Sequence, residues 1–203
     1  MRIRGIRRGP VILDNWNAWA YRGLVGWWCP SALSPTGLSL LDLSGNNNTG
    51  TLTNMDAPTD WVQSGGRLAL DFDNTNDTVS MTSIETIRSG SLAVSCWYYP
   101  NTTSGLNQIF AQWLNTGIIA FRNGTALAWQ IGNRLTTASV FTASTWHHVV
   151  CFRQADGTLR AMVNGVLDAG TSTATNQSST EPFLLGGPVG GAGTGAGLSL
   201  IHI

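Results

Sequence analysis

The acidic and amide residues of the segment DLSGNNN are the first group in the sequence that could bind an ion. Asp42, Asn46 and Asn48 all belong to this short polar run. Calcium takes about six to eight oxygen ligands from carboxylates, amides and backbone carbonyls on flexible loops. Asp77 follows a predicted strand and could add a second carboxylate to a calcium site. The alternative is that Asp42 and the asparagines shape a turn through local hydrogen bonds, and the sequence leaves both hypotheses open.

The tryptophans form a second group, because a flat indole can cover the apolar face of a sugar ring. The chain has nine of them. Trp61 in APTDWVQSGG and Trp113 in QWLNTG lie in predicted loops and are the preferred ligand-binding candidates. Others predicted in loops or near strand ends are Trp16, Trp19 and Trp129. Those predicted to lie in the core are Trp27, Trp97 and Trp146.

The carboxylates do not form the pattern that glycoside hydrolysis needs. A retaining enzyme requires two carboxyl groups about 5 Å apart, which acidic residues at alternate positions of one strand can provide. The chain has only two glutamates, Glu85 and Glu181, and neither belongs to such an array. Asp71 and Asp73 are the nearest equivalent, on one face of a predicted strand. We therefore expect a non-catalytic protein, with a glycoside hydrolase as the weakest alternative.

The two adjacent histidines do not predict a metal site. His147 and His148 fall in a predicted strand, where neighbouring side chains point to opposite faces, so they cannot chelate one ion together. His148 alternates with Trp146 and Val150, which favours a core or interface position for this histidine.

Strands must position these residues, because apolar residues recur with a period of two along most of the chain. In SLAVSCWYY, one predicted face carries Leu92, Val94, Cys96 and Tyr98. Asn123-Gly124 and Asn164-Gly165 each separate two apolar runs, which is a strong hairpin signal because type I′ turns need positive φ angles. Residues 92–167 therefore predict an antiparallel meander of six or seven strands. Shorter strands are expected before it, at residues 23–28, 49–52, 67–73 and 78–81.

Composition excludes several classes of partner. Eleven basic residues balance eleven acidic ones, so no basic surface for nucleic acid is expected. No apolar run approaches the ~18 residues that span a bilayer. Residues 1–20 carry four arginines in the first eight positions, but polar residues interrupt the following apolar stretch, so we predict an arm or linker and no signal peptide. The three cysteines lack metal-ligand spacing; we expect buried free thiols at Cys96 and Cys151, with a disulfide between them as the alternative.

Four stretches, in this order, resemble the laminin-G-like group of concanavalin A-like lectin/glucanase domains. They are GLVGWWCPSALSPTGLSLLDLSGNNNTGTL, RLALDFDNTNDTVSM, GSLAVSCWYYP and WHHVVCFRQADGTLRAMVNGVLDAG. The resemblance covers residues 23–187 and implies an all-β jelly-roll sandwich of two antiparallel sheets. Domains of this group frequently bind a calcium ion at the sheet rim. Asn74 replaces the glycine that usually follows Phe-Asp, and Cys96 replaces a core residue.

The end of the chain departs from the family pattern. The family closes with a strand pair that returns beside the first strand, whereas this chain ends in LSLIHI, residues 198–203. This hexapeptide resembles a translation of the transposon end used in sequencing-library adapters. We therefore expect a laminin-G-like domain over residues 21–197, incomplete at its C-terminus, and a non-native tail. We also expect an early strand at residues 23–28 whose edge is bare or is poorly occupied by LSLIHI. A natural apolar tail is the alternative.

Together these observations predict a binding or adhesion module whose partner is a glycan or surface polysaccharide, with calcium as a candidate cofactor. The first alternative is a structural or protein-interaction domain of a phage or surface particle. In either case we expect an extracellular, virion or cell-surface location as part of a larger assembly, although no signal peptide is seen.

Overall fold

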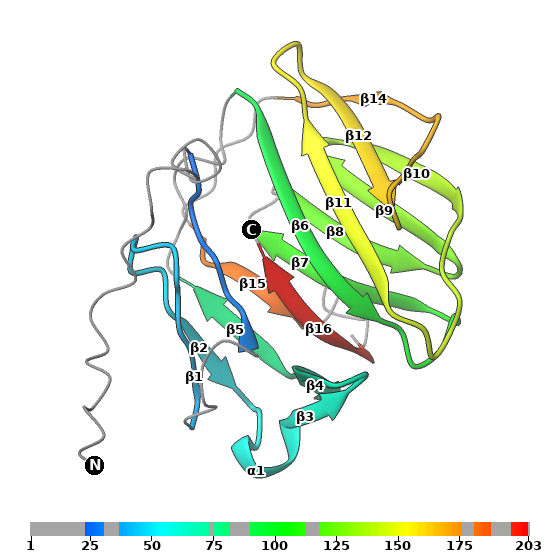
Figure 1. The fold of residues 1–203 in the computed structure, drawn as a ribbon. Helices are drawn as coiled ribbons and strands as arrows, with labels where there is room; N and C mark the ends of the chain where they lie inside the picture. The colour runs from blue at the N-terminus through cyan, green and yellow to red at the C-terminus, as the bar shows by residue number, and fades with distance from the viewer. Residues whose placement is uncertain are drawn as a thin grey trace, which may run out of the picture.

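The computed structural model shows two antiparallel β-sheets packed face to face, with a single short helix, α1 (Ala57–Asp60), in the part of the chain that it describes (Figure 1). The structure describes residues 23–30, 37–73, 75–81, 90–112, 118–175, 181–187 and 196–202. The all-β jelly-roll sandwich predicted from the sequence is therefore confirmed. Among the helices of these ranges, none has the length and apolar character to cross a lipid bilayer.

The first sheet has the strand order β1-β2-β5-β15-β7-β8-β9-β10. Its strands are β1 (Ser39–Leu40), β2 (Gly50–Thr53), β5 (Thr78–Met81), β15 (Phe183–Gly186), β7 (Leu106–Gln112), β8 (Ile118–Asn123), β9 (Ala126–Ile131) and β10 (Asn133–Ser139).

The second sheet has the order β13-β12-β11-β6-β16-β4-β3, and β14 pairs with β12 beside this path. Its strands are β13 (Val166–Leu167), β12 (Thr158–Val163), β11 (His147–Arg153), β6 (Leu92–Tyr99), β16 (Ala196–His202), β4 (Arg67–Asp73), β3 (Trp61–Ser64) and β14 (Ser172–Thr173). This sheet faces the viewer in Figure 1.

The predicted continuous meander over residues 92–167 is wrong in its topology, because this region is divided between the two sheets. Strands β7 to β10 form a meander in the first sheet, and β11 to β13 form another in the second. Strand β6 pairs with β11 and not with β7, so the chain crosses between the sheets before β7 and again before β11. Local turn signals predict hairpins, but they do not show which longer connections change sheets.

The Asn164-Gly165 hairpin forms as predicted. Both residues have positive φ angles, 53° and 80°, and the flanking pair Val163 and Val166 is in register, as a two-residue type I′ connection requires. The Asn123-Gly124 signal also marks a hairpin. Its strands β8 and β9 pair from Asn123 and Ala126 onward, which leaves Gly124 and Thr125 as the connecting residues.

The core lies between the sheets and determines which face of each strand points outward. In β6, Val94, Cys96 and Tyr98 are buried, as the alternation predicted. In β11, the buried side chains are His147, Val149, Cys151 and Arg153. Cys151 lies opposite Val94 and Val149 opposite Cys96, and directly opposed residues of paired strands share a face. Of the two positions predicted for His148, core or interface, the core position is therefore wrong: His147 lies there, and His148 is half-buried on the outer face.

The C-terminal segment forms β16, in the interior of the second sheet (Figure 1). Its backbone pairs with β4 from Ala196 to Ser199 and with β6 from Leu198 to His202. The truncation hypothesis predicts that the edge of residues 23–28 is bare or is poorly occupied by this segment. The structure instead places it between β4 and β6, and residues 23–28 contribute a single bridge, between Trp28 and Asp42. The adapter origin of LSLIHI and the domain boundaries stay predictions, and residues 1–20 lie outside the described ranges.

The cysteines are unbridged. Cys96 and Cys151 are buried free thiols, as predicted. Burial raises the pKa of Cys96 to about 12 and raises the pKa of Cys151 well above its ordinary value, so both remain protonated at neutral pH.

Candidate functional site

A tight hairpin between β3 and β4 positions the first part of the candidate site. Ser64 and Arg67 are paired, so Gly65 and Gly66 alone make the connection, with positive φ angles of 59° and 75°. Glycine adopts this conformation without steric cost. The hairpin therefore places Gly65 at its tip and directs Arg67 from the first position of β4.

Strand β6 positions the second part. Because Val94, Cys96 and Tyr98 point into the core, the alternate residues Trp97 and Tyr99 lie on the outer face, where both are half-buried. The Trp97 ring lies against His148 of the neighbouring strand β11, with 5.1 Å between ring centroids. His148 is itself held by a 2.8 Å hydrogen bond between its Nε2 and the Ser95 hydroxyl. The Trp97 indole is therefore supported from one side by two outward-facing residues.

Trp146, directly before β11, supplies the third part. Its indole Nε1 donates a 3.2 Å hydrogen bond to the Ser64 hydroxyl, and its ring centroid lies 5.4 Å from that of Tyr99. A Cβ added to Gly65 would lie 3.4 Å from this Nε1, so the hairpin tip and the indole are already in contact. The hairpin thus fixes Trp146 in position across the sheet.

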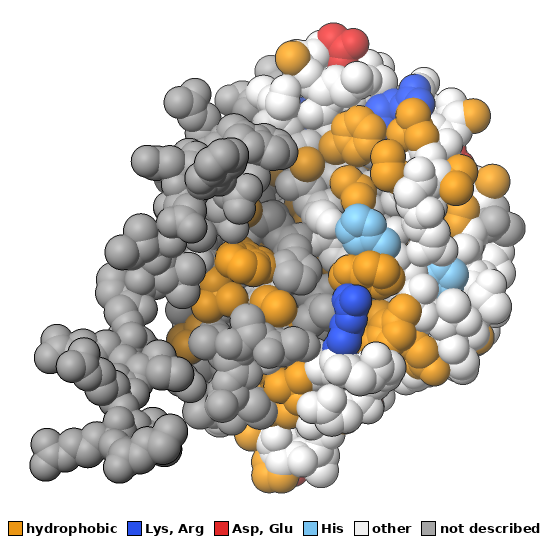
Figure 2. Space-filling model, in the orientation of Figure 1, with side chains coloured by type: hydrophobic (Ala, Val, Ile, Leu, Met, Phe, Trp, Pro, Cys, Tyr) orange, Lys and Arg blue, Asp and Glu red, His pale blue; other side chains and the backbone are white. Residues whose placement is uncertain are grey.

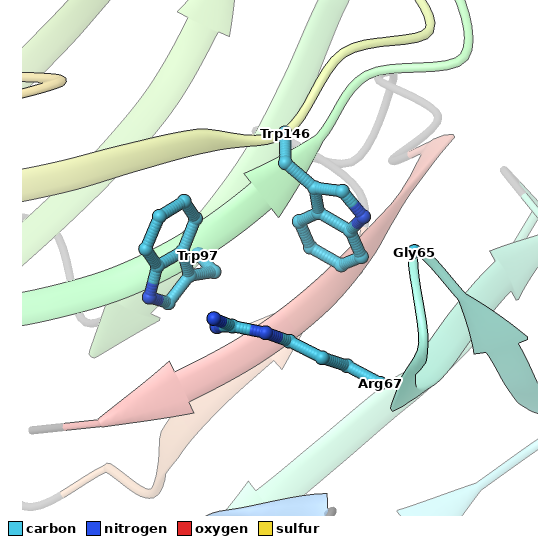
Figure 3. Close-up of a pocket in the computed structure, with 4 residues that line it drawn as sticks. All are labelled: Gly65, Arg67, Trp97 and Trp146. Atoms are coloured by element: carbon cyan, nitrogen blue, oxygen red, sulfur yellow. The ribbon is translucent and has the colours of Figure 1, made fainter.

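These elements enclose a pocket of about 170 Å³ lined by Gly65, Arg67, Trp97 and Trp146. Figure 3 shows the three side chains converging from separate elements, with β16 passing between β4 and β6 beneath them. The Arg67 guanidinium carbon lies 5.1 Å from the centre of the Trp97 ring, which is a cation–π contact. In Figure 2, apolar side chains gather over β6 and β11 on this face, beside a histidine and a basic side chain. The pocket therefore offers the Trp146 ring, a Trp97 ring that Arg67 and His148 already contact, and one cation.

The predicted calcium loop is a hydrogen-bonded turn in this structure. The Oδ1 of Asp42 accepts hydrogen bonds from the backbone N–H groups of Trp27 and Ser44, and its Oδ2 accepts from the Ser44 hydroxyl and the Asn48 N–H. The side-chain amides of Asn46 and Asn48 donate to backbone carbonyls of Leu24 and Val25. These contacts use the carboxylate oxygens that a cation would need, so they favour the turn-shaping hypothesis.

The pKa of Asp42 agrees with that assignment. Burial would raise this pKa, but the hydrogen bonds from Trp27, Ser44 and Asn48 together outweigh burial and lower it. The loop in turn holds the core, because the Asn48 carbonyl accepts a 2.8 Å hydrogen bond from Nε1 of the buried Trp28.

Asp77, the fourth predicted metal ligand, does not belong to the loop that contains Asp42. It lies in the β4–β5 turn, is 3% exposed, and accepts a 2.8 Å hydrogen bond from the backbone N–H of Asp73. Burial and the charges of Asp73 and Asp60 raise its pKa. Among the described residues, no group of three or more His, Cys, Asp or Glu side chains could hold a metal ion. Calcium binding stays a prediction.

The predicted sugar-binding tryptophans lie elsewhere. Trp61 is half-buried, packs against the edge of the core, and donates its indole N–H to the Gly37 carbonyl at 3.2 Å. Trp113 lies outside the described residues. Trp129, expected near a loop, is fully buried in β9, and Trp28 takes the core position predicted for its neighbour Trp27.

Sequence reasoning missed Trp97 and Trp146 as functional residues because it assigned both to the core. The period of two in β6 was a usable signal, since it places Trp97 opposite to the buried Val94, Cys96 and Tyr98. For Trp146 no equivalent signal exists, because its position depends on contact with a hairpin about 80 residues earlier in the chain.

The aspartates of β4 lie on its outer face with Arg67. Burial and the charges of Asp60 and Asp73 raise the pKa of Asp71, partly offset by a hydrogen bond from the backbone of Phe72. These interactions do not identify a pair of carboxyl groups that could act together on a ligand. The absence of catalysis stays a prediction.

A family profile supports the assignment from the fold. The profile described as the concanavalin A-like lectin/glucanases superfamily, of the laminin G type, matches residues 73–198, more than half of the chain. The chain belongs to this superfamily. Comparison with curated proteins finds no match.

This superfamily member resembles parts of longer chains among the solved structures. The binding domain of Paraclostridial mosquitocidal protein 1 matches with a TM-score of 0.66 and 15% identity, over 89% of this chain and 48% of that one. The receptor-binding domain of a botulinum neurotoxin C/D mosaic serotype gives 0.66 and 11%, over 90% and 48%. Trypanosoma rangeli sialidase in complex with sialic acid gives 0.64 and 14%, over 89% and 30%. At these identities the likeness concerns the fold, and this chain spans at most about half of each neighbour.

Proposed function

We propose that this domain is a non-catalytic carbohydrate-binding module that holds a sugar ring in the pocket of Gly65, Arg67, Trp97 and Trp146. The supporting observation is the pair of half-buried indoles on the outer sheet face, fixed by the contacts of Trp97 with His148 and of Trp146 with Ser64. Prepositioned aromatic rings bind at a low entropic cost, and they match the apolar face of a pyranose.

The size of the pocket agrees with a small ligand group. Its volume of about 170 Å³ is below the ~300–1,000 Å³ of typical drug-sized sites. A single sugar ring at the end or side of a longer glycan fits this description better than an extended polypeptide does. Membership of a lectin-containing superfamily supports the class of function, and the partner would be a glycan on a cell or particle surface.

A glycan array with matched tryptophan variants tests the proposal. We expect Trp97→Ala to lower affinity for the bound glycan about ten- to a hundredfold, because it removes one wall of the pocket and the ring over which Arg67 lies. Trp61→Ala is the matched control, since Trp61 is also half-buried but lies outside the pocket. Loss of binding in the Trp61 variant with full binding in the Trp97 variant would reject this pocket and restore the site predicted from the sequence.

A protein-interaction domain is the second candidate function, and one observation favours it. Val166 and Leu167, in the edge strand β13, are 72% and 45% exposed. An apolar edge strand is a surface to which another chain can add. Absence of binding to every glycan on the array, together with self-association that a Val166→Lys change abolishes, would favour this alternative.

A further inference from the structure

We infer that the sugar bound in this pocket carries a carboxylate, so that the ligand class is a uronic or other carboxylated sugar. This inference rests on the proposed function and adds a charge to the ligand. The inference depends on Arg67, which lines the pocket beside both indoles.

The Arg67 guanidinium has hydrogen-bonding capacity to offer a ligand. A guanidinium carries five N–H donors. Within the described residues, the Arg67 guanidinium lies over the Trp97 ring, with its central carbon 5.1 Å from the ring centroid, and it forms no hydrogen bond or ion pair. Figure 3 shows the Arg67 side chain extending from β4 toward the Trp97 ring, beside Trp146, so its N–H donors lie at the pocket.

The charge of Arg67 is not balanced by a carboxylate of the described chain. The acidic side chain that follows on the same face of β4 is Asp71, and Arg67 forms no ion pair with it or with another carboxylate of the described residues. A neutral sugar that covered Arg67 would remove water from a cation and return no counter-charge, which is unfavourable. A ligand carboxylate would supply that counter-charge.

Geometry favours a carboxylate as the anionic group. A guanidinium edge donates two parallel hydrogen bonds to a planar carboxylate, and such bidentate pairs are among the strongest polar contacts. In a uronic acid the carboxyl group is attached directly to the ring. A ring packed against Trp146 could therefore direct its carboxylate toward Arg67 from within the same small pocket.

A matched set of sugars and variants tests this inference. Calorimetric titrations would compare oligomers of galacturonate, glucuronate and mannuronate with their carboxyl-reduced neutral forms, using the whole chain. We expect one acidic oligomer to bind about ten- to a hundredfold more tightly than its reduced form. Arg67→Gln should remove this difference. Arg134→Gln is the control, because Arg134 stacks on Phe121 at 4.9 Å in the other sheet and should leave it unchanged.

The outcomes separate this inference from the proposed function. Equal binding of acidic and reduced oligomers, lost in Trp97→Ala, would overturn the carboxylate and leave the sugar site in place. Arg67-dependent binding of sulfated oligomers alone would also overturn it. Failure of all saccharides, with unchanged thermal unfolding of each variant, would reject the sugar site itself.

Discussion

Two polar regions of this molecule use their side chains in opposite ways. The loop around Asp42 contains most of the residue types that bind cations, yet its carboxylate accepts four hydrogen bonds from its own loop and from Trp27. The pocket on the outer sheet face has one cation, Arg67, and that group forms no hydrogen bond to a described residue.

The contrast shows that residue type alone does not identify a binding site. Polar groups that hydrogen-bond to one another stabilise a turn. Polar groups that are held in place but have no hydrogen-bond partner in the protein can bind a ligand. Asp42 is of the first kind and Arg67 of the second. Substitutions at the two regions should therefore have different effects on stability and on binding.

Removing the Asp42 carboxylate should destabilise the fold. Asp42→Ala leaves the N–H groups of Trp27, Ser44 and Asn48 without their acceptor, so we expect a loss of roughly 2–4 kcal/mol in the free energy of unfolding. Urea denaturation at pH 7 measures it. Glycan affinity per folded molecule should stay unchanged, and a specific loss of binding would show that the loop belongs to the site.

The same variant has a pH signature. Because the folded state lowers the pKa of Asp42 from 3.8, its stabilising contribution is present above that pH and is lost as pH falls through the lower folded value. The difference in unfolding free energy between wild type and Asp42→Ala should therefore narrow below about pH 4. A constant difference across this range would contradict the assignment.

A change at the hairpin tip should affect stability and binding together. Gly65→Ala places a side chain at a φ angle of 59° and 3.4 Å from the Trp146 Nε1, so we expect a loss of about 1–2 kcal/mol in stability and weaker glycan binding. Thermal unfolding and titration measure the two effects. Gly66→Ala, with a similar φ angle of 75° but open space around it, is the control for strain without contact.

Neutralising Asp77 should raise the free energy of unfolding, whereas removing the Asp42 carboxylate should lower it. The pKa of Asp77 is raised, so its ionised form is less favourable in the folded protein, and stability present below pH 3.8 is lost as pH rises through the folded value. Asp77→Asn keeps an acceptor for the Asp73 N–H and should stabilise the protein by up to about 1 kcal/mol at pH 7. Urea midpoints that fall on this substitution would show that the charge itself is needed.

Calcium should have the smallest effect. If the Asp42 carboxylate is already committed to the turn, added calcium should shift the unfolding temperature no more than added magnesium does, and EDTA should not lower it. A calcium-specific increase, abolished in Asp42→Ala, would instead show that a cation replaces the hydrogen bonds and would restore the predicted metal site.

The fold was predictable because its signals are local. The alternation in β6 identified the core residues Val94, Cys96 and Tyr98, and Asn164-Gly165 identified a turn by its need for positive φ. The division of the meander was not predictable in this way, because the pairing of β6 with β11 depends on long connections.

The candidate site was predicted poorly for a related reason. In β11 the apolar residues Val150 and Phe152 lie on the outer face, while His147 and Arg153 point inward, so hydrophobicity favoured the wrong face. His147 is accommodated by hydrogen bonds with Thr142 and Asn164 that only the tertiary structure reveals.

The position of β16 links ligand binding to the order of the chain terminus. Neighbouring strands lie about 4.8 Å apart. Arg67 on β4 and Trp97 on β6 are therefore separated by two strand spacings, and β16 lies between their strands. A saccharide that contacts both residues would bind most tightly when that strand is docked, and bound sugar would in turn hold the strand in place. Resistance of the C-terminus to carboxypeptidase digestion should therefore increase with sugar concentration.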